Sequence, residues 1–311
     1  MSTLRGFLMT VLVGGLLSTS SLAFADGISV SSGALSNDAR TKLENDIAQA
    51  KVSMPKAFDA VKNVKGHRPE HYRKNRNPYP TVSRELRGLG APALLPMLEA
   101  LAFQAPARGS LTDAEWDALA SGMLEAVGVL RDSRSGPVLK AIFESGSVRP
   151  QVRAAAARAL GRLGGDAEAA LLISHAKRGD SAELDAVQGL GEMLRLDGAK
   201  HLAQVLATTK DPAVAEAAAT ALGTAGSSWA WRSLGPKAEA TGLEVRKVCA
   251  AALADRFVAS RGKARTAIAE SVLIVDHPDT VAFLTQVRDK DRVAVDALVA
   301  RVERQRKRST R

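Results

Sequence analysis

The fold is decided by the stretch Val152–Gly164, which reads VRAAAARALGRLG. Apolar and small side chains recur in it at spacings of three and four, which is typical of one face of an α-helix. Small side chains let a neighbouring helix approach closely, and a glycine after the last turn permits the left-handed residue that ends many helices. The stretch therefore predicts a closely packed helix ending near Gly164, with Leu160 buried.

The same pattern recurs along the chain at an interval near 31 residues. Glycines in equivalent positions lie at 128, 161, 191 and 223, and Ala254 follows 31 residues later. A second helix is expected after the glycines, for example over 167–176 and 198–207, and Asp211-Pro212 predicts an N-cap with proline at the first helical position. A two-helix unit of this size cannot bury its apolar face alone, so the units must stack on one another.

The composition supports a helical protein. The 311 residues include 55 alanines, whereas aromatic residues make up only 4%. This profile argues against a sheet protein and excludes collagen-like and disordered classes. The single Cys249 excludes an intrachain disulfide and a cysteine-based metal cluster, and its apolar neighbours predict that it is buried.

With the repeat pattern established, the stretch 152–164 resembles the HEAT-like repeat, including the variant found in phycobilin lyase-like proteins. Residues 211–214 with 221–223, and residues 244–246 with 252–253, are similar to the same consensus. The resemblance covers roughly residues 80–260. It implies an all-α fold, an α-solenoid that forms a right-handed superhelix of HEAT-like helical hairpins, with about 30–33 residues per repeat. The motif defines a fold and transfers no catalytic residue.

Four parts of the chain are expected. Residues 1–25 are predicted to be a signal peptide, 26–80 an N-terminal helical cap and basic loop, 81–306 the HEAT-like solenoid, and 307–311 a basic C-terminal tail. Within the cap, helices are expected over 37–53 and 55–64, and a loop over 66–80.

Export is expected from the N-terminal residues. A short apolar run follows Arg5, and Ala23 and Ala25 supply the small residues of a cleavage site. The run is too short to span a bilayer, and no transmembrane segment is expected in the mature chain. The sequence therefore predicts an exported protein, periplasmic or secreted after cleavage between Ala25 and Asp26.

The net charge of +10 is concentrated in two segments. Residues 62–76 and 301–311 each have a net charge of +5, so the rest of the mature chain is close to neutral. Such segments attract polyanions and anionic lipid. Binding of a polyanion or an anionic membrane surface through 62–76 and 304–311 is one alternative function, and peripheral contact with such a surface stays open.

Motifs for catalysis are weak. Residues 67–71 read HRPEH, the spacing of some zinc proteases, but Pro69 disrupts the required helix and six nearby cations oppose a divalent metal. Residues 88–93 imitate a dinucleotide fingerprint without a preceding strand. The sequence thus predicts no catalytic, cofactor-binding or metal-binding residues and a protein that is not an enzyme. A lyase or another enzyme built on a HEAT-like scaffold is the further alternative.

The resemblance implies that the Val-Arg-type helix of each unit lines the concave side of the stack. Its polar positions alternate in sign between units, whereas duplex DNA favours a continuous basic track. A mixed surface suits a protein or peptide partner and argues against sequence-specific nucleic-acid binding. Trp231 is expected in the core, and Trp229 as an exposed anchor.

The leading hypothesis is an exported, non-enzymatic scaffold that binds a protein or peptide on its concave face. The predicted partner-binding residues are Arg153, Arg158, Arg162, Glu183, Gln188, Glu192, Glu216, Thr220, Arg246, Lys247 and Trp229.

Overall fold

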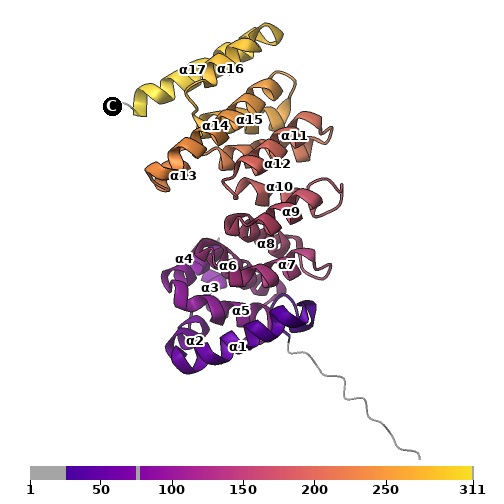
Figure 1. The fold of residues 1–311 in the computed structure, drawn as a ribbon, viewed down its shortest axis with the longest axis vertical. Coiled ribbons are helices and arrows are strands. Elements are labelled where there is room, and N and C mark those ends of the chain that lie inside the picture. The colour runs from indigo at the N-terminus through magenta and orange to yellow at the C-terminus, as the bar shows by residue number, and fades with distance from the viewer. Residues whose placement is uncertain (1–25, 75–77, 310–311) are drawn as a thin grey trace, which may run out of the picture.

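A computed structural model describes residues 26–74 and 78–309 of the chain (Figure 1). Helices are the dominant element over these residues, and the extended pairing among them is a single bridge between Asp26 and Ser31. The chain folds as an all-helical α-solenoid of HEAT-like hairpins, as the repeat pattern predicts. No helix among the described residues is long and apolar enough to cross a membrane.

The repeats form two rows of helices. One row, called here the inner row, contains α4 (Pro78–Gly88), α6 (Asp113–Leu130), α8 (Pro150–Leu163), α10 (Glu183–Gly191), α12 (Pro212–Ala225) and α15 (Gly262–Val275). The outer row contains α5 (Leu94–Ala102), α7 (Gly136–Glu144), α9 (Asp166–His175), α11 (Leu196–Thr208), α14 (Pro236–Phe257) and α16 (Thr280–Gln286). Successive helices of the inner row pack directly on one another throughout.

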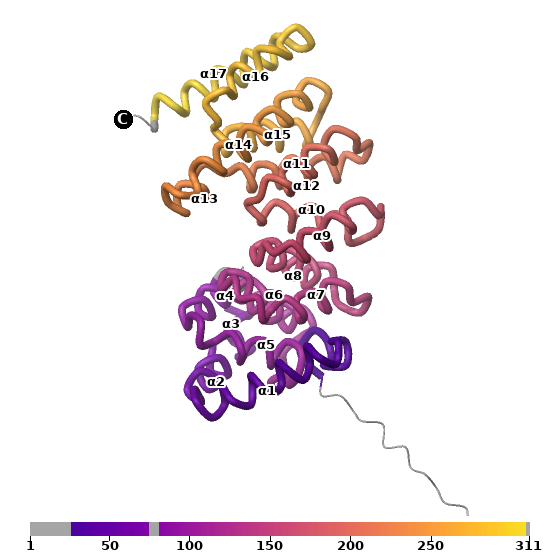
Figure 2. Tube along the Cα trace, viewed as in Figure 1, coloured from indigo at the N-terminus to yellow at the C-terminus, as the bar shows by residue number. Residues whose placement is uncertain are grey.

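The remaining helices lie at the ends of the stack or project from it. The N-terminal end consists of α1 (Asn37–Ser53), α2 (Pro55–Lys62) and α3 (Pro69–Lys74), and α17 (Arg292–Ser309) closes the other end. A short helix, α13 (Ser228–Ser233), lies between α12 and α14. Figures 1 and 2 show the stack bending so that α4 and the C-terminal end of α17 lie toward the side from which α13 projects. The C-terminal ends of the inner-row helices lie on this side, next to α13.

The repeat glycines mark places where inner-row backbones touch. A Cβ atom added to Gly128 would lie 2.8 Å from the Cα of Ala159, and one added to Gly191 would lie 2.9 Å from the Cα of Ala221. A Cβ on Gly161 would overlap the carbonyl oxygen of Gly189. Close packing is therefore the reason for glycine at these positions.

The predicted unit around Ala254 is wrong. A Cβ added to a repeat glycine would contact the residue that lies two positions before the equivalent repeat position in the next inner helix. For Gly223 this contact is Ser271 of α15, whose Oγ would lie 2.6 Å from the added Cβ. The residue equivalent to Gly223 is thus Leu273. Ala254 lies in α14 of the outer row. The cause is an insertion, since α13 and the long α14 separate α12 from the next inner helix.

The N-terminal cap helices are confirmed, and the loop predicted over 66–80 is not. A 3₁₀ helix covers Lys65–His67, and α3 begins at Pro69, where proline is compatible with the first helical turn. Residues 75–77 lie outside the described part of the chain, as does the predicted signal peptide 1–25.

The predicted basic tail also differs. Residues 307–309 continue α17, and Arg306 donates to Asp276 Oδ1 at 2.9 Å and to the His277 carbonyl at 2.6 Å. Residues 310 and 311 lie outside the described residues. Arg306 therefore connects α17 to the α15–α16 connection, and the helix continues to Ser309.

The predicted core residues are buried. Leu160 is 1% exposed and Trp231 5% exposed, and the Trp231 Nε1 donates to the Ala225 carbonyl at 2.7 Å. Cys249 is fully buried, which raises the pKa of its thiol to about 12. A thiol in this setting is protonated and unreactive at neutral pH.

Candidate functional site

The predicted concave-face arginines of α8 are engaged with neighbouring repeats. Arg153 Nε lies 2.6 Å from Asp185 Oδ2 of α10, and its Nη2 donates to the Ser181 carbonyl at 2.6 Å. Arg158 Nε lies 2.9 Å from Glu125 Oε1 of α6. Both guanidinium groups therefore connect repeats within the inner row.

Arg162 connects three helices. It is paired with Glu125 of α6 and, at 3.1 Å from its Nε, with Glu192 Oε2 of α10. Burial opposes ionisation of Glu125, but the charges and hydrogen bonds of Arg162 and Arg158 outweigh it and hold the pKa of Glu125 below its usual range. This cluster contains two carboxylates and two guanidinium groups, so its charges compensate internally.

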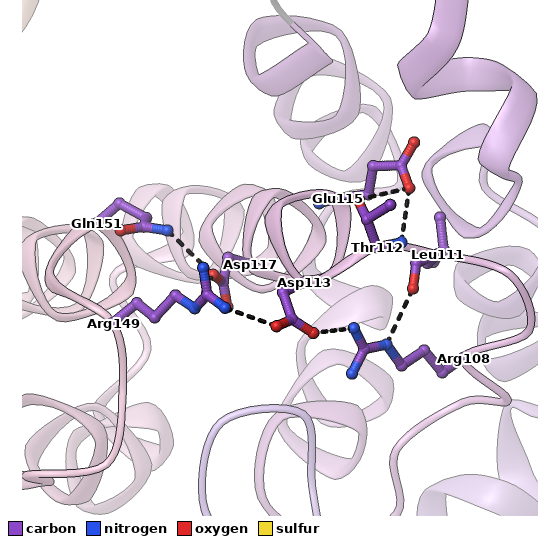
Figure 3. A network of polar contacts seen from close by, with 8 residues as sticks. All are labelled: Arg108, Leu111, Thr112, Asp113, Glu115, Asp117, Arg149 and Gln151. Atoms are coloured by element: carbon purple, nitrogen blue, oxygen red, sulfur yellow. Dashed lines mark hydrogen bonds and ion pairs between the residues drawn. The ribbon is translucent and has the colours of Figure 1, made fainter.

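The charged contacts continue at the N-terminal ends of α6 and α8 (Figure 3). Asp113 is paired with Arg108 and, at 2.7 Å, with Arg149 Nη2, while Arg149 Nε lies 3.0 Å from Asp117 Oδ2. Gln151 Nε2 also donates to Asp117, at 3.0 Å. The inner face of α6, α8 and α10 thus has a ladder of contacts that holds adjacent repeats together.

The other predicted residues of α10 and α12 have weaker contacts. Glu183 is half-buried in the first turn of α10, where burial, followed by the charges of Asp211 and Asp180, raises its pKa. Gln188 is exposed and accepts from Arg158 at 3.4 Å. In α12, Glu216 is half-buried, and the exposed Thr220 donates to the Glu216 carbonyl at 3.0 Å. These residues do not define a separate site.

The placement of Arg246 and Lys247 on the inner face is wrong, because α14 belongs to the outer row. Arg246 donates from Nε to the Val275 carbonyl at 2.9 Å and from Nη2 to the Asp276 carbonyl. Its guanidinium group therefore satisfies carbonyls at the C-terminal end of α15, while Lys247 is exposed on α14.

A groove on the concave side is the strongest candidate site. It has a volume of about 440 Å³ and lies where the C-terminal ends of the inner helices meet α13; we call it the α13 groove. Its floor consists of the residues that directly follow the repeat glycines or their equivalent Leu273: Val129, Arg162, Glu192, Thr224 and Ile274. Trp229 and Leu234 contribute from α13 and its C-terminal end, and Arg131 and Leu194 from the ends of α6 and α10.

Four apolar side chains around this groove are accessible. Trp229 is 73% exposed, Ile274 48%, Leu234 47% and Val129 43%. Single exposed apolar residues are ordinary, but a contiguous set on one concavity is characteristic of a binding surface. The predicted exposure of Trp229 is confirmed. The other three were not identified from the sequence. Ile274 was missed because the repeat was continued at Ala254, whereas the equivalent residue in the structure is Leu273.

Arg131 and Leu194 have unusual backbone conformations. Both have φ of 52°, in the left-handed region that non-glycine residues seldom occupy. Each lies three residues after its repeat glycine, and the corresponding residue of α8 is Gly164, with φ of 72°. Sequence reasoning missed both residues.

The two basic segments lie at opposite ends of the stack (Figures 1 and 2). The exposed cations near α3 are Lys62, Lys65, Arg68, Arg73 and Lys74, and those of α17 are Arg301, Arg304, Lys307 and Arg308. The bulk of the solenoid separates the two groups, so they do not form one surface.

The described residues contain no group of three or more His, Cys, Asp or Glu side chains arranged to hold a metal ion. The HRPEH residues are divided between two elements, with His67 in a 3₁₀ helix and His71 in α3. Burial lowers the pKa of His67.

The fold is that of a HEAT-like α-solenoid, and the α13 groove is its candidate binding surface. No family model matches the sequence, and no curated protein sequence matches it. Among solved structures the chain is similar to human deoxyhypusine hydroxylase in complex with glycerol, with 16% identity and a TM-score of 0.36 over 84% of this chain and 98% of that one.

This comparison corrects the prediction that the protein is not an enzyme. The similar chain is named as a hydroxylase. At this identity and TM-score the likeness assigns no reaction, substrate or cofactor to the present chain.

Proposed function

We propose that the protein is a binding scaffold that holds a protein or peptide partner on its concave side, in the α13 groove. The observation that carries this proposal is the convergence of four exposed apolar side chains, from α6, α15 and the α13 segment, on one concavity. Burying such side chains against a partner contributes about 25 cal/mol for each Å² of apolar surface removed from water.

The groove suits a peptide segment better than a small molecule enclosed in a pocket. Trp229 is 73% exposed, so most of its surface lies outside the concavity, where an extended partner can cover it. Tryptophan is among the residues that contribute most to protein interfaces when a partner buries them.

The ion-pair ladder supports the same assignment. Arg153 and Arg158 are already bound to neighbouring repeats, and using them for a partner would require breaking contacts between repeats. The apolar side chains of the α13 groove have no such competing partner.

A peptide selection tests the proposal. A chain of residues 26–311 is immobilised, and peptides that bind it are selected from a display library of random twelve-residue peptides. The enriched peptides are then measured on the wild type and on a Trp229→Ala/Ile274→Ser double variant. Loss of two large apolar contacts is expected to weaken binding at least tenfold, because each contributes about 1 kcal/mol or more.

The matched control is Val293→Ser, which removes an apolar side chain that is 83% exposed on α17, outside the groove. This variant is expected to bind like the wild type. Peptides that bind the double variant as well as the wild type would contradict the proposal.

Polyanion binding through 62–76 and 304–311 is the competing function. At physiological salt, interactions between exposed charges that are more than about 8 Å apart are largely screened. Binding that disappears at physiological salt, and is unaffected by the Trp229→Ala/Ile274→Ser change, would favour this alternative.

A further inference from the structure

We infer that the partner segment of the α13 groove is acidic as well as apolar: a peptide that places a carboxylate on Arg131 beside an aliphatic or aromatic side chain in the groove. This inference rests on the proposed function and specifies the chemistry of the partner. It follows from the charge left uncompensated in the groove and from the backbone conformation of two of its residues.

The ionisable residues that line the groove are Arg131, Arg162 and Glu192. Arg162 and Glu192 are paired with each other at 3.1 Å, within the cluster whose charges compensate internally. Arg131 is exposed, and no ion pair joins it to another residue in the described part of the chain. The groove therefore presents one available cation.

Carboxylates close to the groove are directed elsewhere. Asp132, next to Arg131 in sequence, lies 2.7 Å from the Nη2 of Arg134. Asp276, two residues after Ile274, lies 2.9 Å from the Nε of Arg306. The fold thus leaves Arg131 to a carboxylate from outside, which its planar guanidinium group can bind with two parallel hydrogen bonds.

The backbone at Arg131 and Leu194 supports a role for these side chains. A left-handed conformation destabilises the folded state when the residue is not glycine, and Gly164 shows that glycine fits the corresponding position of α8. Residues held in strained conformations cluster at binding and active sites. Of the three non-glycine residues with positive φ in the described part of the chain, two line the α13 groove, Arg131 as its available cation and Leu194 as an apolar wall, and the third, Asp276, follows α15.

The two side chains also differ in what they offer a ligand. Arg131 and the exposed Val129 both line the groove, and Leu194 lies two residues after the paired Glu192. A segment lying in the groove would therefore meet a cation next to apolar surface. A carboxylate side chain adjacent to a large apolar one complements this arrangement.

The experiment uses peptides selected on the wild type from the random twelve-residue library, with affinities measured by fluorescence anisotropy. Peptides that depend on Trp229 and Ile274 are expected to contain Asp or Glu next to Leu, Ile, Phe or Trp. Changing that carboxylate to the amide is expected to weaken binding to the wild type about tenfold, because the contact is charge-assisted.

Arg131→Asn provides the second arm of a double-mutant cycle, because asparagine tolerates the left-handed conformation without the charge. On this variant the acid and amide peptides are expected to bind equally. Arg301→Asn, which removes an exposed arginine of α17, is the matched control and is expected to leave the acid–amide difference intact.

A stability measurement separates binding from folding. Arg131→Gly is expected to raise the melting temperature by about 1–3 °C, because glycine relieves the backbone strain. The same change is expected to weaken binding of the acidic peptide about tenfold, because the guanidinium group is lost. A variant that is more stable yet binds less cannot have lost affinity through unfolding.

The outcomes distinguish the two proposals. Groove-dependent peptides that lack a carboxylate, or whose binding is unchanged by Arg131→Asn, overturn this inference and leave the proposed function in place. If no selected peptide depends on Trp229 and Ile274, the proposed function fails, and the inference fails with it.

Discussion

Arg162 of α8 donates from its Nε to Glu192 Oε2 of α10 at 3.1 Å, and the same guanidinium group is paired with Glu125 of α6. One side chain thereby joins three consecutive repeats. The stability of a solenoid is approximately the sum of its repeats and of the interfaces between neighbours, so a residue that spans two interfaces affects both.

Replacement of Arg162 by methionine is expected to lower the free energy of unfolding by about 1–3 kcal/mol, because two partly buried carboxylates lose a partner while the apolar stem is retained. Urea denaturation followed by circular dichroism measures the change. Arg292→Met is the control, since its pair with Asp296 spans 3.9 Å at the surface, and its effect is expected to stay within about 0.5 kcal/mol. Equal effects of the two changes would refute this role for Arg162.

The same cluster predicts a pH dependence. The pKa of Glu125 is held below its usual range in the folded chain, so the unfolded chain binds a proton more readily at this site. The stabilisation is complete above the ordinary glutamate pKa of about 4.3 and is lost as the pH falls from there through the folded pKa. Glu125→Gln is expected to reduce the loss of stability between pH 6 and pH 3. Identical pH profiles for variant and wild type would contradict the prediction.

The stacking could be predicted because contact between helix backbones excludes large side chains at regular intervals. In the sequence this requirement is visible as the repeat glycines at 128, 161, 191 and 223. The prediction misplaced the next unit because Ala254, in the alanine-rich α14, has the same small size although it lies in the outer row. The true equivalent, Leu273, is a large residue, and no size pattern identifies it.

The candidate site was harder to predict than the fold. The alternating charges of Arg158 and Glu192 suggested a partner surface, but such alternation is also what complementary repeats need to pair with each other. The residues Arg131 and Leu194 were missed because their significance depends on a backbone φ of 52°, which a side-chain pattern does not encode. The sequence did contain one indication of them, since each lies three residues after a repeat glycine, Gly128 or Gly191.

Gly161→Ala is expected to destabilise the protein by at least about 1–3 kcal/mol. The added methyl group would overlap the Gly189 carbonyl oxygen, and rigid backbones on both sides leave little freedom to relax. Gly88→Ala is the matched control, because no atom lies within 4 Å of its added Cβ, and in the last turn of α4 it is expected to be neutral or slightly stabilising. Thermal denaturation of both variants checks the prediction. A neutral Gly161→Ala would contradict the close approach of α8 and α10.

Leu160→Asp is expected to destabilise repeats well beyond α8. Leu160 is 1% exposed, its burial contributes roughly 2–3 kcal/mol, and an unpaired carboxylate in its place adds a further penalty. Because each repeat is stabilised by its neighbours, the damage should pass along the inner row. The thiol of Cys249 in α14 reports on this, since it is fully buried and unreactive in the folded chain.

The measurement is the rate at which a thiol reagent modifies Cys249 in mild urea, where the wild type stays folded. The rate is expected to rise at least tenfold in Leu160→Asp, because opening at α8 lowers the free energy of exposing the later repeats. Leu184→Asp is the control, since Leu184 in α10 is 37% exposed and can hold a solvated carboxylate. If Cys249 stays protected in Leu160→Asp while helical content near α8 is lost, the repeats unfold independently and the solenoid does not couple its two ends.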